Sequence, residues 1–250
     1  MNLFELFVKI GVDDQASGKL KDIGGKLGNG LKTAAKIGTA AVGAAAAGIT
    51  ALTTAAVNNY AEYEQLVGGV DTLFKESSQK VQEYAANAFR TAGMSANEYM
   101  STVTSFSASL LQSLGGDTDK AAEYANQALT DMSDNANKMG TSIESIQNAY
   151  QGFAKQNYTM LDNLKLGYGG TKEEMQRLLD DAGKISGIKF DISSFADITQ
   201  AIHIMQEEMG IAGATAAEAE GTLSGSLSAM KASWHNLTVG IADENADIDA

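Results

Sequence analysis

Few side chains in this 250-residue sequence have types and spacing that could support catalysis or metal binding. The sequence contains no cysteine, which excludes disulfides, thiolate zinc sites, iron–sulfur clusters and cysteine nucleophiles. The two imidazoles, His203 and His235, lie 32 positions apart and indicate neither a metal site nor an acid–base pair. The adjacent carboxylates Asp180-Asp181 and Glu207-Glu208 would point about 100° apart on a helix, so they do not converge on one substrate. We therefore expect a protein that is not an enzyme, with no cofactor and no metal.

One glycine-rich stretch, Gly167-Tyr168-Gly169-Gly170-Thr171-Lys172, has residue types that can cradle a phosphate at a helix N-terminus. Its glycine and lysine spacing differs from that of a P-loop. Thr171 and Glu174 also form the Thr-x-x-Glu pattern of a helix-capping box, which uses the same residues to begin a helix. The pattern therefore favours a structural turn over a phosphate site.

The composition predicts that helices position all of these side chains. The chain has no proline, where average usage of about 5% would give about 12, and aromatic residues are only 7%. Because proline breaks helix interiors, its absence permits long helices. Four Ser/Thr-x-x-Glu capping boxes mark helix starts, at Ser95-Glu98, Thr141-Glu144, Thr171-Glu174 and Thr215-Glu218, and glycines such as Gly140 and Gly183 mark stops. The predicted fold class is mainly α, a multi-helix assembly with helices over residues 60–74, 78–91, 96–113, 118–138, 142–157, 172–182, 194–209 and 216–242.

Two apolar patterns predict which helix faces are buried. Tyr99, Val103, Phe106 and Leu110 recur at helical spacing and predict one buried stripe. Trp234, in the last predicted helix, shares a face with several apolar residues and is predicted to be a core anchor.

The sequence divides into three regions of different composition. Region 1–60 contains a short predicted strand at residues 3–12, a lysine/glycine linker and a small-residue apolar helix, and it carries six lysines against four acids. Region 61–242 is the predicted compact helical region, and 243–250 is an acidic tail or linker. Residues 61–250 carry 12 basic and 27 acidic side chains, so they repel phosphate, and we expect no sequence-specific nucleic-acid partner.

The segment Ile37–Val57 has no charged residue and would rise about 31 Å as a helix, which is long enough to cross a bilayer. Nine of its 21 residues are alanine, so the signal for membrane insertion is marginal. Seven-residue spacings along it also predict a coiled-coil seam, in which small residues permit close helix approach. Two interpretations are open, a buried or self-associating helix and a helix that inserts into a membrane. The residues predicted to form this self-association or membrane segment, which we call the heptad seam, are Ile37, Val42, Ala45, Ile49, Leu52 and Val57.

Several blocks spread over nearly the whole chain resemble one family of proteins. They are Val8–Asp13, Tyr63–Val70, Ala92–Tyr99, Ser105–Leu111, Asp131–Gly140, Tyr150–Tyr158, Leu164–Thr171 and Ser228–Leu237. In this order they resemble the N-terminal region of the tail tape-measure proteins of tailed phages and prophages of Gram-positive bacteria. Members of that family are usually several times longer, so the chain resembles an N-terminal fragment or a truncated copy.

The resemblance implies a structural protein of the virion tail lumen that is made in the host cytoplasm. Such proteins set tail length, because tube protein polymerises around several copies of them, and they are thought to assist DNA passage through the host envelope. The implied partners are further copies of the chain, the tail tube protein, tail assembly chaperones, tail-tip proteins and the host membrane. The alternative hypothesis is a secreted helical effector or a pore-forming protein that uses the same apolar helix.

Overall fold

The computed structural model describes residues 42–221 and 223–242, about 78% of which are helical, and these residues include no strand. The predicted mainly α class is therefore confirmed. The strand predicted at residues 3–12, the lysine/glycine linker and the acidic tail 243–250 lie outside the described residues. The helices are α3 (Val42–Phe74), α4 (Ser78–Thr91), α5 (Ala96–Ser113), α6 (Thr118–Met139), α7 (Ile143–Phe153), α8 (Lys172–Ser186), α9 (Phe195–Glu208), α10 (Ala214–Gly221) and α11 (Leu223–Ala242), with short 3-10 helices η2 (Lys75–Ser77) and η3 (Leu161–Leu164).

The chain divides into two compact units. One comprises Gln65–Ser233, and the other combines Met1–Glu64 with Trp234–Ala250. Helix α3 has 33 residues and rises about 50 Å, so the predicted boundary between residues 60 and 61 falls inside a continuous helix. In the second unit, Asn59 Nδ2 of α3 donates a hydrogen bond to Thr238 Oγ1 of α11 at 2.7 Å.

Helices α4, α5 and α6 begin at the predicted residues, and at α5 and α6 local side chains accept hydrogen bonds from the first amides. At α5, Ser95 accepts a hydrogen bond from the Glu98 amide while the Glu98 carboxylate accepts one from the Ser95 amide, so the predicted capping box is confirmed. Asp117 caps α6 by accepting from the amide of Lys120. At the other end of α6, Gly140 has φ of 65°, a left-handed conformation that glycine adopts without strain.

The other predicted helix signals are only partly correct. Thr171 caps α8, but the Glu174 carboxylate accepts from Gly169 instead of returning to the cap, so that box is half formed. Helix α7 is capped by Ser142, one residue after the predicted Thr141. The predicted stop at Gly183 is wrong, because α8 continues to Ser186.

The predicted box at Thr215 is also wrong. Helix α10 begins before Thr215, and the Thr215 amide donates to the carboxylate of Asp134 on α6. A carboxylate from a distant part of the chain thus takes the place of the local cap.

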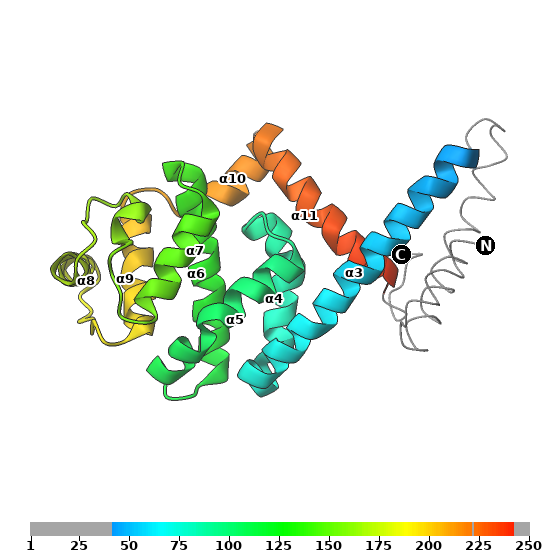
Figure 1. Ribbon diagram of the computed structural model, residues 1–250. Helices are drawn as coiled ribbons and strands as arrows, with labels where there is room; N and C mark the ends of the chain where they lie inside the picture. The colour runs from blue at the N-terminus through cyan, green and yellow to red at the C-terminus, as the bar shows by residue number, and fades with distance from the viewer. Residues whose placement is uncertain (1–41, 222, 243–250) are drawn as a thin grey trace. The chain divides into compact units, whose positions relative to one another are not determined.

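The apolar core of the 65–233 unit lies between α4, α5, α6, α7 and α9, and Figure 1 shows α5, α6 and α9 in this part of the fold. The predicted stripe on α5 is confirmed, since each of its four side chains is at most 2% exposed. Phe106 of α5 meets Phe195 of α9 edge-on, with ring centroids 5.8 Å apart. Helix α8 packs on α9, and α10 packs on α6 and α4.

The predicted core role of Trp234 is wrong. Its side chain is 57% exposed, and Met230 and Leu237 on the same face of α11 are also exposed. The buried side chains among the described residues of α11 are smaller, at Ala232, Thr238 and Val239. Small side chains let a helix approach its neighbours closely, so these side chains pack in place of the indole.

Candidate functional site

Helix α6 buries a run of polar side chains inside the 65–233 unit. Asp131, Ser133, Asp134 and Asn135 are each at most 3% exposed. A buried carboxylate or amide without a hydrogen bond costs several kcal/mol, so most such groups are hydrogen-bonded. We call Asp131, Asp134 and Asn135 the α6 polar cluster, because each of the three bonds a different distant segment.

Asp134 holds the start of α10. Its Oδ2 accepts from the Gly213 amide at 2.6 Å, and its Oδ1 accepts from the Thr215 amide at 2.8 Å. The first amides of a helix have no partner within the helix and give its N-terminus a partial positive charge. The carboxylate therefore caps α10 across about 80 residues of sequence. Asn137 adds a bond of 2.8 Å from its Nδ2 to the Thr215 hydroxyl.

Asp131 joins α6 to α9 through a histidine. The Nδ1 of His203 lies 2.9 Å from Asp131 Oδ1, and its Nε2 lies 3.3 Å from the Glu207 carboxylate. The bond to Asp131 raises the pKa of His203 above its ordinary value, and Glu207 acts in the same direction. Burial raises the pKa of Asp131, since the charged form is desolvated, although its bond to His203 opposes that change.

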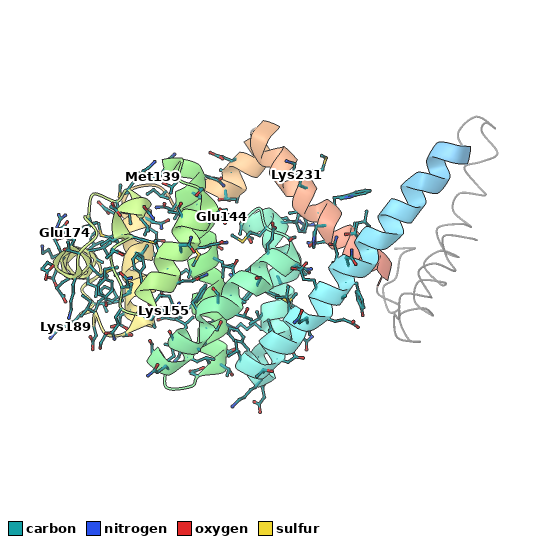
Figure 2. The ribbon with its side chains drawn as sticks, in the orientation of Figure 1. Met139, Glu144, Lys155, Glu174, Lys189 and Lys231 are labelled. Carbon is teal, nitrogen blue, oxygen red and sulfur yellow. The ribbon has the colours of Figure 1, made fainter. Side chains whose placement is uncertain are left out.

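Asn135 secures the chain that follows α7. Its Nδ2 donates to the Leu164 carbonyl of η3 at 2.9 Å. Close by, Lys165 Nζ donates at 2.8 Å to the carbonyl of Met139, which Figure 2 labels at the C-terminal end of α6. The Met139 carbonyl at the end of α6 and the Leu164 carbonyl of η3 thus each accept a hydrogen bond from the other segment.

The cluster makes hydrogen bonds between helices and lacks the geometry of a hydrolytic site. In a Ser-His-Asp triad, the carboxylate orients an imidazole whose other nitrogen activates a hydroxyl nucleophile. Here the other nitrogen of His203 faces the Glu207 carboxylate. No set of three or more His, Asp or Glu residues in the described part of the chain could hold a metal ion.

The glycine-rich loop before α8 is occupied by its own chain. The Gly169 amide donates to the Glu174 carboxylate, labelled on α8 in Figure 2, at 3.0 Å. Arg177 donates to the Gly167 carbonyl at 2.9 Å and lies 4.4 Å from the centre of the Tyr168 ring. The predicted structural turn agrees with these contacts, because the Gly169 amide already donates to a carboxylate of the same chain.

The predicted heptad seam lies in α3, except for Ile37, which is outside the described residues. Val42, Ala45, Ile49, Leu52 and Val57 all belong to this one continuous helix, and the structure does not describe their side chains. Ala56, seven positions after Ile49, is fully buried. It lies one turn before Asn59, whose bond to Thr238 brings α11 against this part of α3.

Membrane insertion was one of two interpretations of Ile37–Val57, and the structure describes this segment only from Val42 onward. None of the helices among the described residues is both long enough and apolar enough to cross a membrane. The segment's apolar residues are mostly alanines, which contribute little hydropathy.

Sequence reasoning missed the α6 polar cluster and its partner His203. Glu207 and Glu208 are both exposed, as expected for carboxylates that do not converge on one substrate, but Glu207 also lies beside the imidazole, which the sequence did not indicate. A helical wheel could have shown that Asp131 and Asn135 share a face with the apolar Ala128 of α6, which is buried. No family model matches the chain, and neither a curated protein nor a solved structure matches it.

Proposed function

We propose that the chain is the N-terminal region of a phage tail tape-measure protein, a structural protein around which the tail tube assembles. The observation that carries this proposal is the unbroken 33-residue helix α3, joined to a compact helical unit. A molecular ruler needs a segment whose length is proportional to its residue number. An α-helix provides this at 1.5 Å per residue.

The charge pattern of α3 supports a scaffold of several copies. Residues 42–57 carry no charge, and the seven-residue spacings from Val42 to Ile49 and from Ala45 to Leu52 are typical of helices that associate along their length. The blocks that resemble the family also contain structurally important residues, since Asp131–Gly140 includes the whole α6 polar cluster.

Protein partners fit the electrostatics better than DNA does. Residues 61–250 carry 15 more acidic than basic side chains, which repels phosphate. We infer that the chain binds further copies of itself, the tail tube protein, tail assembly chaperones and tail-tip proteins. It would then reside in the host cytoplasm during assembly and in the lumen of the finished tail.

Self-association is the part of this proposal that purified protein can test. Replacing Ile49 by Lys places a charge on the heptad seam and should weaken an oligomer measured by sedimentation velocity. Replacing Asn58, which is exposed on the same helix, by Lys is the matched control and should leave the oligomer intact. A monomer for the unsubstituted chain, or equal weakening by both substitutions, would show that the seam is no oligomer contact.

Removal of the reading frame from the phage or prophage that encodes it tests the assembly role. We expect electron microscopy to show particles without tails, or tubes of irregular length, and a plasmid copy of the complete gene to restore uniform tails. Normal tails in the deletion strain would contradict the proposal and favour the secreted-effector alternative.

A further inference from the structure

His203 joins two helices that belong to distant parts of the 65–233 unit. Its imidazole lies on α9 and is 21% exposed, while Asp131, 72 positions earlier on α6, is 3% exposed at its side chain. Glu207, one turn further along α9, faces the other ring nitrogen. The imidazole is thus bracketed by two carboxylates, one buried and one in contact with solvent.

We propose that Asp131, His203 and Glu207 form a proton-operated clamp, which closes α9 onto α6 when His203 is protonated and loosens this joint when the proton is lost. A protonated imidazole donates from both nitrogens and can bond one oxygen of each carboxylate at once. A neutral imidazole has one donor, so one carboxylate loses its partner. If Asp131 keeps the donor, Glu207 is merely hydrated, whereas the opposite tautomer would leave the buried Asp131 carboxylate unpaired.

The two carboxylates beside His203 favour its cation, whereas its burial opposes it. Asp131 acts from α6 and Glu207 from α9, while Asp134 of α6 acts on Asp131, whose pKa it raises. Helix α7 contributes Tyr150, which is fully buried and has its pKa raised by burial, with Asp131 adding to that effect.

The charged side chains of the other helices that pack on α9 have partners of their own. On α5, Glu98 bonds Ser95 at the helix cap and Tyr99 bonds Asn126. On α8, Glu174 bonds Arg177 and Asp180 bonds Gln176 of the same helix. Asp181 bonds Lys184 of that helix and Tyr168 of the preceding loop. Lys172 and Glu173 are exposed at the first turn. His203 therefore meets its cation-stabilising partners on α6 and α9.

The direction of the pH effect follows from these contacts. The folded pKa of His203 lies above its ordinary value of 6.5, so the clamp is fully closed below that value and loosens as pH rises through the folded pKa.

Hydrogen exchange with mass spectrometry tests the clamp in the intact chain. Protection factors corrected for intrinsic exchange are measured for α9 and, as an internal reference, for α4, from about pH 6 to about pH 9. Because a charge-assisted hydrogen bond is roughly twice as strong as a neutral one, α9 protection should fall about fivefold more than α4 protection.

Two substitutions separate the clamp from a merely structural contact. His203→Gln can still donate to Asp131 but does not titrate, so α9 protection should lose its pH dependence. His235→Gln removes the other histidine of the chain and should keep the wild-type pH dependence. A pH-independent wild type, or an equal fall in His203→Gln, would overturn the proposal. If His203→Gln does not fold, NMR titration of the wild-type imidazole decides, and a His203 pKa at or below 6.5 would overturn it.

Discussion

Replacing Asp134 by Ala should cost the 65–233 unit a large part of its stability, because this carboxylate caps α10 from a buried position. Asp134 is 1% exposed and accepts from two backbone amides, those of Gly213 and Thr215. A hydrogen bond to a charged group contributes about 1.5 to 3 kcal/mol. Two such bonds at the lower end of that range give an expected loss of about 3 kcal/mol in the free energy of unfolding.

Urea unfolding followed by circular dichroism measures this loss, and a thermal scan checks it. For a unit of this size, 1 kcal/mol corresponds to about 2 to 4 °C, so the midpoint temperature should fall by roughly 6 to 12 °C. Asp134→Asn keeps one acceptor oxygen but turns an amide NH2 toward the second donor. Its free energy of unfolding should therefore fall by at least about half as much as that of Asp134→Ala.

Asp180→Ala is the matched control, since it removes a carboxylate from an exposed helix position where the side chain bonds Gln176 of the same helix. Its effect should stay within about 0.5 kcal/mol. If Asp134→Ala also falls within that range, the long-range cap does not hold α10 in solution and the reasoning is refuted.

Three further predictions test the loops, the caps and the fold class. Gly170→Ala should destabilise the chain by roughly 1 to 3 kcal/mol in thermal unfolding, because the added Cβ would lie 2.3 Å from the Thr159 carbonyl oxygen. Gly68→Ala, in open space on α3, should be neutral or stabilise by up to about 1 kcal/mol, and equal losses for both would contradict the packing described. Ser95→Ala should lower the free energy of unfolding by about 1 kcal/mol in urea titrations, and no change would mean that the capping box is open in solution. Far-ultraviolet circular dichroism should give at least about 60% helix for the intact chain, and a spectrum dominated by strand would contradict the fold class.

The parts of the fold that were predictable from the sequence depend on neighbours along the chain. The start of α5 follows from Ser95 and Glu98, which lie three residues apart and bond each other. The buried stripe of the same helix follows from side-chain spacing, because residues three or four apart share a face. These local patterns gave the limits of α5 correctly.

The parts that could not be predicted depend on contacts between distant segments. Helix α10 begins where Asp134 supplies a cap, about 80 residues away, so the local signal at Thr215 was misleading. His203 gained its role from Asp131, 72 positions earlier, and no spacing rule links the two. The prediction that Trp234 is a core anchor was wrong for a related reason, because hydrophobicity alone does not decide which face of α11 packs.

The tape-measure proposal is tested most directly by tail length in virions whose chain carries a longer α3. Duplicating residues 42–62 adds 21 residues, three complete heptads, and therefore keeps the register of the helix face. At 1.5 Å per residue, the mean tail length measured by electron microscopy should increase by about 31 Å relative to the unaltered phage. The same number of residues inserted at the exposed loop around Gly115 and Gly116 serves as a control for added mass. An increase with the α3 duplication alone is the predicted result, and tails of unchanged length would contradict a ruler function for this helix.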